Sequence, residues 1–275
     1  MKILVIGASS YIGARVYFDL RSKYELVGTY FTHSLSSLFI QLDITNQKEV
    51  IEVVSTHKPD IIIHLANYSS SRYVPKPGES LEKLNLESTR FVVDAAKKAG
   101  CKLVFISSMA AVTKLNPYGE CKYKSEELVI NSGLDYLVLR PSAVMGLSPN
   151  QSNKKIIDRV IGVINGESDQ FDNSWILQPT YIGHFSQIIT QLIDKNLWNR
   201  TINLFTDHGV TQYQIATDIL TYFNKTTKPD FTGRTIPLFP NNLEELKHFT
   251  LIPSTYSYII TMIVKEINNR NYYVI

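Results

Sequence analysis

Three polar side chains occur at spacings suited to proton transfer. Tyr118 and Lys122 are four residues apart, so on a helix they share one face, and Ser108 follows the apolar run 103–107. A phenol can protonate the alkoxide left by hydride transfer to a ketone, and a nearby ammonium group lowers its pKa. A serine hydroxyl can hold the carbonyl oxygen. We predict Ser108, Tyr118 and Lys122 as a catalytic set. The alternative is an exposed helix pair and a strand cap.

The elements around these residues alternate between strand and helix. Short apolar runs rich in β-branched residues predict buried parallel strands, and amphipathic segments such as 83–99 predict crossover helices. This alternation predicts an α/β fold with a Rossmann-type, doubly wound parallel sheet. Ser108 then lies at the carboxyl edge, where such sheets bind ligands. The predicted strands are 2–6, 25–30, 61–65, 103–107 and 136–140.

A glycine-containing turn joins the first strand to the first helix. Gly7 and Gly13 flank Ser10, which stands where a three-glycine phosphate turn has its middle glycine. Small residues there let a pyrophosphate reach backbone N–H groups at a helix N-terminus. The alternative is a plain tight turn without a ligand. The predicted cofactor contacts in this turn are Gly7, Ser9, Ser10, Tyr11, Ile12 and Gly13.

The segment after the second strand bears on the choice of cofactor. An acidic residue there would bind both ribose hydroxyls and favour NAD, but residues 29–34 contain no carboxylate. Thr32 and His33 could bind a 2′-phosphate, so NADP is favoured and NAD stays open. Asp43 and Ile44 are predicted to lie against the adenine. The alternative for Asp43 is a position in the N-cap region of the next helix.

Further polar residues at the ligand edge are candidates for substrate contacts. Tyr68, Ser69 and Arg72 follow the third predicted strand, although an ordinary polar loop explains them equally well. Arg140 ends a strand and could face the cleft or form a structural salt bridge. The six histidines show no close pair and no cysteine partner at metal-ligand spacing, so we expect no metal centre. His64, within a strand, is predicted to be a core residue.

Composition narrows the class of protein. The 275 residues are 44% hydrophobic and 19% charged, enough to bury a large core. The net charge of +3 is spread along the chain, which argues against nucleic acid as a partner. Two cysteines cannot form a disulfide framework, residues 1–7 do not resemble a signal peptide, and the longest apolar stretch, 249–264, is too short and interrupted to cross a membrane. We expect a cytoplasmic protein without a membrane anchor, and a terminal helix in that stretch.

The chain resembles the extended short-chain dehydrogenase/reductases, and within them the dTDP-4-dehydrorhamnose reductase and NAD-dependent epimerase group. The resemblance implies catalysis by Ser108, Tyr118 and Lys122. It implies that Leu65, Ala66 and Asn67, together with Tyr118 and Lys122, contact the cofactor. The segments that carry it are 7–13, 42–44, 58–66, 85–89, 106–108, 118–122, 139–142 and 178–182.

The same resemblance implies two lobes that interleave in sequence. Residues 1–146, with a return segment at about 181–206, would form the NAD(P)-binding Rossmann domain. Residues 147–180 and 207–275 would form a smaller, mixed α/β substrate lobe. A nucleotide-sugar substrate would bind between the lobes, in contact with Ser108, Met109 and Arg140. A homodimer is left open.

Departures from the family pattern limit the reaction. Met109 and Ala110 follow Ser108, where related dehydratases have an acidic pair and related epimerase-reductases a cysteine. The segment 239–243 replaces a substrate motif of the rhamnose-forming enzymes. Reduction of a nucleotide-linked 4-keto sugar needs only the three catalytic residues and NAD(P), so it is the predicted function. The alternatives are a sugar-nucleotide 4-epimerase and a non-catalytic NADP-binding regulatory subunit.

Overall fold

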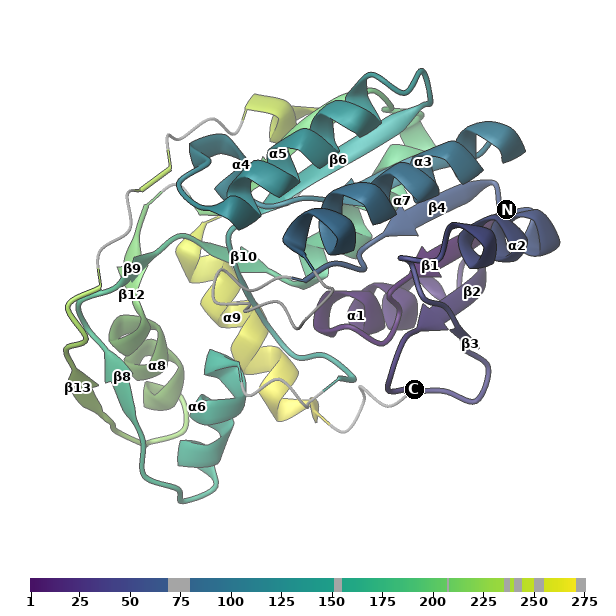
Figure 1. The fold of residues 1–275 in the computed structure, drawn as a ribbon. Helices are drawn as coiled ribbons and strands as arrows, with labels where there is room; N and C mark the ends of the chain where they lie inside the picture. Colours follow the sequence, from purple (N-terminus) through teal and green to yellow (C-terminus); the bar gives the residue numbers. More distant parts are fainter. Residues whose placement is uncertain are drawn as a thin grey trace.

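A sheet of seven parallel strands forms the centre of the molecule (Figure 1). The computed structural model describes residues 1–68, 80–150, 155–206, 208–234, 238–239, 244–249 and 255–270. The strand order β11-β6-β5-β4-β1-β2-β3 confirms the predicted Rossmann-type α/β fold. The strands are β1 (Lys2–Ile6), β2 (Glu25–Tyr30), β3 (Ile40–Gln41), β4 (Ile61–His64), β5 (Lys102–Ile106), β6 (Tyr136–Pro141) and β11 (Arg200–Leu204).

The inner residues of the central strands are apolar because helices cover both faces of the sheet. In β1, Ile3 and Val5 belong to one hydrophobic cluster, while Leu4 and Ile6 belong to the other. Side chains of a strand alternate between the two faces, so a strand buried on both sides reads as a continuous apolar run. This explains why these strands were predictable from sequence.

Helices α2, α3 and α5 pack on one face of the sheet, and α1 and α7 pack on the other. The segment predicted as one helix at 83–99 begins instead with a π-helical turn, η1. The elements of this lobe are α1 (Tyr11–Leu20), α2 (Gln47–His57), η1 (Glu82–Glu87), α3 (Ser88–Ala99), α4 (Ala110–Thr113), α5 (Pro117–Ile130) and α7 (Gly183–Lys195).

The chain leaves the sheet after β6 and later returns to it as β11. Ile202 of β11 is in register with Leu139 of β6, and α7, which precedes β11, packs against α1. The return segment therefore supplies both the edge strand beside β6 and a helix of the α1 face. The lobe boundaries themselves stay a prediction.

The other described elements form short strand pairs, the helices α6, α8 and α9 and the 3-10 helix η2, with α9 between α1 and the pair α6 and α8 (Figure 1). The terminal helix expected within 249–264 lies at α9. The described residues contain no helix long and apolar enough to span a membrane. The elements are β7 (Ala143–Met145), α6 (Ile156–Ile164), β8 (Gln170–Asp172), β9 (Ile176–Leu177), β10 (Pro179–Tyr181), β12 (Val210–Thr211), α8 (Gln212–Thr221), β13 (Lys228–Asp230), η2 (Glu244–His248) and α9 (Tyr256–Asn268).

Candidate active site

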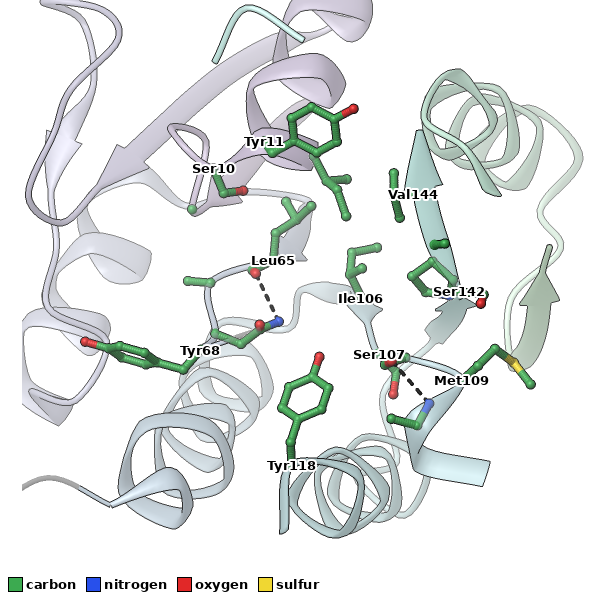
Figure 2. A pocket seen from close by; sticks show the side chains of 18 of the residues that line it. Ser10, Tyr11, Leu65, Tyr68, Ile106, Ser107, Met109, Tyr118, Ser142 and Val144 are labelled. Atoms are coloured by element: carbon green, nitrogen blue, oxygen red, sulfur yellow. Dashed lines mark hydrogen bonds between the residues drawn. The ribbon is translucent and has the colours of Figure 1, made fainter. Parts of the chain in front are cut away.

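A cavity of about 1220 Å³ runs along the carboxyl ends of the central strands. Figure 2 shows Ser10 and Tyr11 on one side of it and Ser142 and Val144 on another, with the Tyr118 hydroxyl pointing between them. The structure thus brings most of the predicted site residues together. Those that line the cavity are Gly7, Ser9, Ser10, Tyr11, Ile12, Thr32, His33, Asp43, Ile44, Leu65, Ala66, Asn67, Tyr68, Ser108, Met109 and Tyr118.

The glycine turn is tight, and both of its glycines are required by close approaches. Gly7 has φ +92°, and a Cβ there would lie 2.9 Å from the Ala66 nitrogen. A Cβ on Gly13 would lie 2.1 Å from the Gly7 carbonyl oxygen. Gly13 is outside the cavity lining and serves instead to pack the helix on the turn. Ser10 caps α1, its hydroxyl oxygen accepting from the Gly13 N–H at 3.0 Å.

The turn has the features of an anion-binding site. The N-terminus of α1 opens onto the cavity, where its partial positive charge favours a phosphate group. The buried hydroxyl of Ser9, a lining residue, has no hydrogen-bond partner among the described residues. Because the Ser10 oxygen only accepts in its capping bond, its O–H is also available to donate. These observations fit a dinucleotide diphosphate at this turn.

Asp43 lines the cavity but already has local partners. One of its carboxylate oxygens accepts from the Thr45 N–H at 2.9 Å and from the Thr45 hydroxyl at 2.7 Å. Its own N–H donates to Glu49 at 3.0 Å. Asn46, not Asp43, caps α2. Asp43 therefore orders the turn before α2 through one carboxylate oxygen, and its contact with an adenine stays a prediction.

Tyr118 is placed at the cavity by the start of α5. Asn116 caps the helix, its side-chain oxygen accepting from the Gly119 N–H at 2.8 Å, and Pro117 occupies the first turn. Burial raises the pKa of Tyr118 to about 12, and a hydrogen bond with the Ser108 side chain acts in the opposite direction. The phenol thus holds its proton near neutral pH, beside the serine predicted to bind a carbonyl oxygen.

Lys122 differs from its predicted role. Its Nζ donates to the Ile106 carbonyl oxygen at 2.8 Å and lies 4.2 Å from the Phe105 ring centroid. The side chain is 1% exposed and is not part of the cavity lining. Burial lowers the pKa of Lys122 to about 7, and the pKa of Tyr118 is raised rather than lowered. Desolvation is the largest cause of both pKa shifts, so a lowering of the Tyr118 pKa by Lys122 stays a prediction.

Arg140 is also not brought to the cavity. Its Nη2 lies 2.5 Å from a carboxylate oxygen of Glu126, which is 1% exposed and also accepts from the Ser107 hydroxyl. The structural alternative for Arg140 is the one observed, because a buried carboxylate requires a charged partner. Ser69 and Arg72 lie outside the described residues.

His64 is part of the core, as predicted. Its Nε2 lies 3.2 Å from the Thr89 hydroxyl oxygen. Burial lowers its pKa to about 3, so the ring is neutral at neutral pH. Within the described ranges, no cluster of three His, Cys, Asp or Glu side chains is placed to hold a metal ion.

The far side of the cavity was largely missed by sequence reasoning. It is built by β9, by the start of α8 and by residues 238–239, and it is mostly apolar. Strands of two residues carry no readable hydrophobic period, so only the pairing of Val210 with Leu177 shows that these segments meet. The missed residues are Asn150, Lys155, Ile156, Trp175, Ile176, Leu177, Gln178, Gln212, Leu238 and Phe239.

The order of the sheet, the glycine turn after its first strand and the placement of Ser108 and Tyr118 at the sheet edge together define an α/β protein of the Rossmann type. Residues 3–173 match the model of the NAD dependent epimerase/dehydratase family. The chain belongs to this family, in agreement with the resemblance seen in its motifs.

Named relatives span several activities. The chain is 26% identical over 260 residues to the decarboxylating sterol-4-alpha-carboxylate 3-dehydrogenase of Candida albicans. The match covers 81% of this chain and 72% of the relative. It is 22% identical over 244 residues to the methionine adenosyltransferase 2 subunit beta of Bos taurus, with the same coverage. A dTDP-4-dehydrorhamnose reductase from Bacillus anthracis, solved with NADP, superposes with a TM-score of 0.79 at 23% identity, covering 96% of this chain and 99% of that one.

Proposed function

We propose that this protein is an NADP-dependent reductase of a nucleotide-linked 4-keto sugar, with Tyr118 as the acid. The observation that carries the proposal is the Ser108–Tyr118 pair, which faces the same cavity as the glycine turn. A carbonyl bound beside this pair would also lie within the cavity that accommodates a dinucleotide. The solved dTDP-4-dehydrorhamnose reductase with NADP is similar in fold and supports the same cofactor and substrate class.

The cofactor would be held by four groups of residues at the carboxyl edge. The N-terminus of α1, with Ser9 and Ser10, would hold the diphosphate. Thr32 and His33 would contact a 2′-phosphate, since no carboxylate stands there to repel it. Asp43 and Ile44 would lie at the adenine. Residues 65–67 would line the path between the diphosphate and the catalytic pair. NAD is the alternative.

The chain's own contribution to the reaction is orientation and proton transfer. Ser108 would donate to the carbonyl oxygen and fix it beside the phenol. Tyr118 would give its proton to that oxygen as the alcohol forms, which its pKa of about 12 permits at neutral pH. When bound, NADPH supplies the hydride. Lys122 would act as a positioning residue, because it holds the carbonyl of Ile106 just before the strand end that carries Ser108.

The residue after Ser108 favours reduction over dehydration. Met109 is 1% exposed and lines the cavity, and its thioether cannot remove a proton. A 4-epimerisation would use the same catalytic groups and is the alternative within this class. Tyr68 lines the cavity and is proposed as a substrate contact, and the same proposal extends to Ser69 and Arg72.

A non-catalytic role is the second candidate, because a methionine adenosyltransferase subunit is among the relatives. The two candidates differ in what Tyr118 does. A regulatory subunit would bind NADP without needing the phenol, whereas a reductase would lose turnover when the phenol is removed.

The test is a fluorescence titration of the purified protein with NADPH and with NADH, followed by turnover on a panel of nucleotide-linked 4-keto sugars. We expect NADPH to bind more tightly and one keto sugar to be reduced. Tyr118→Phe should keep NADPH binding and lose reduction. Absence of binding of both cofactors would refute the oxidoreductase. Binding without turnover on any keto sugar would favour the regulatory subunit.

A further inference from the structure

A buried ion pair joins the first helix to the last. Arg15 of α1 is 5% exposed and Glu266 of α9 is 3% exposed, and their side chains meet at 2.6 Å. The Tyr181 hydroxyl donates to the same carboxylate at 2.5 Å, and Asp19 binds the Arg15 Nε. Each charge thus has further hydrogen-bond partners besides the other, which a buried pair requires. None of these four side chains lines the cavity.

The pair grips one residue of the chain by both of its backbone groups. The Leu147 N–H donates to Glu266 at 2.7 Å, and the Leu147 carbonyl accepts from the Arg15 Nη1 at 3.0 Å. Leu147 belongs to the segment 146–150, which directly follows β7. An ion pair that only stabilises the fold would not need this double contact. An ordinary loop would not need it either.

The gripped segment is in turn bonded to the glycine turn. The Ser148 hydroxyl donates to the Tyr11 carbonyl at 2.7 Å, and the Asn150 amide donates to the Ser9 carbonyl at 2.6 Å. The Tyr11 hydroxyl donates back to the Gly146 carbonyl. Ser9 and Tyr11 are the residues whose backbone would face the cofactor diphosphate. The segment 146–150 is therefore hydrogen-bonded to the glycine turn at Ser9 and at Tyr11.

We propose that the Arg15–Glu266 pair is a positioning device for cofactor binding: by fixing Leu147, it holds segment 146–150 against the glycine turn and keeps that turn in its binding geometry. The proposal rests on the proposed function, since it takes the dinucleotide as the ligand of the turn. Glu266 does not line the cavity, yet the proposal makes it a determinant of cofactor affinity.

The experiment compares NADPH binding in Glu266→Gln, Ser148→Ala and the double variant. Glu266→Gln removes the charge that orients Arg15 and should raise the Kd for NADPH about tenfold. Ser148→Ala cuts the bond to the Tyr11 carbonyl and should raise Kd by a smaller factor. In the double variant the two effects should not add, because both act through segment 146–150. Wild-type Kd in both single variants, or full additivity, would overturn the proposal.

A matched control separates positioning from loss of stability. Arg159 of α6 and Asp169 form another ion pair at 2.7 Å, and neither side chain lines the cavity. Asp169→Asn should leave the Kd for NADPH unchanged, and an equal rise there would overturn the proposal. If Glu266→Gln fails to fold, Tyr181→Phe replaces it, because it removes one hydrogen bond to Glu266 and keeps both charges; it should raise the Kd for NADPH by a smaller factor, and an unchanged Kd would overturn the proposal.

Amide hydrogen exchange in the absence of any cofactor provides a second readout. Residues 7–14 should exchange faster in Glu266→Gln and Ser148→Ala than in the wild type, at a temperature where all are folded, and no faster in Asp169→Asn. Unchanged exchange in both variants would overturn the positioning role. Should the wild type bind neither NADPH nor NADH, the proposed function fails, while exchange still tests whether the pair orders the turn.

Discussion

The two sides of the cavity are built in different ways. The side with the glycine turn and Tyr118 is formed by the ends of parallel strands that are buried on both faces. The other side is formed by strand pairs only two or three residues long and by residues 238–239. A binding site for a common cofactor needs a fixed backbone, whereas a site that sets substrate choice can be built from short elements that vary independently.

The largest effect should come from the cofactor side, at the acid itself. Tyr118→Phe removes the only proton donor proposed for the carbonyl oxygen and should lower kcat by about a hundredfold to ten-thousandfold. The Kd for NADPH should stay near the wild-type value. The measurement is steady-state reduction of the keto sugar found in the panel, with the titration as control. Near-normal kcat in this variant would show that another group supplies the proton.

The glycine turn should be the next most sensitive place. Gly7→Ala puts a Cβ 2.9 Å from the Ala66 nitrogen and strains a backbone at φ +92°, so it should cost about 1–3 kcal/mol and lose NADPH binding. Gly133→Ala is the control. Gly133 likewise has a positive φ, +79°, but a Cβ there would meet open space. Urea unfolding measures the loss of stability, and the NADPH titration measures the loss of binding. If the two variants bind equally, the close approach at Gly7 is unimportant.

The pH dependence of the free energy of unfolding tests the environment of Lys122, which is on the cofactor side of the molecule. Its pKa of about 7 lies below the ordinary 10.5, so between these values the folded protein binds fewer protons than the unfolded chain. The contribution of Lys122 to the free energy of unfolding should therefore increase with pH, by at most about 1.4 kcal/mol per pH unit. Urea unfolding from pH 7.5 to 10 should show a steeper rise for the wild type than for Lys122→Met. Parallel profiles would mean that Lys122 titrates normally.

The smallest effect is expected on the other side of the cavity. Trp175 lines it, and Trp175→Ala should raise KM for the keto sugar about three- to tenfold, with NADPH affinity unchanged. Tyr222, which is 62% exposed and outside the lining, is the control for loss of an aromatic side chain. A change in NADPH affinity in Trp175→Ala would mean that the two sides are not independent.

The same contrast explains how much the sequence could predict. The five predicted strands, the glycine turn and the placement of Ser108 and Tyr118 follow from local patterns, because each depends on neighbours in the chain. The Trp175 side depends on which short segments meet, and a pair such as Val210 and Leu177 leaves no periodic signal.

The sequence also could not predict which group each charged side chain contacts. Arg140 ends a strand as predicted, but its neighbour is Glu126, a helix residue that only the packing of α5 on the sheet brings to it. Lys122 shares a helix face with Tyr118, yet α5 turns its ammonium group toward the Ile106 carbonyl. Spacing fixes the face of a helix, while burial decides whether a long side chain reaches the ligand or the backbone.

The separation of Arg15 and Glu266 by 251 residues has a consequence for biosynthesis. A ribosome releases α1 and the glycine turn first, and the Glu266 carboxylate emerges 251 residues after Arg15. A nascent chain can assemble its first strands while this arginine remains solvated and segment 146–150 unrestrained. We expect the nucleotide site to mature last, after the sheet that carries it.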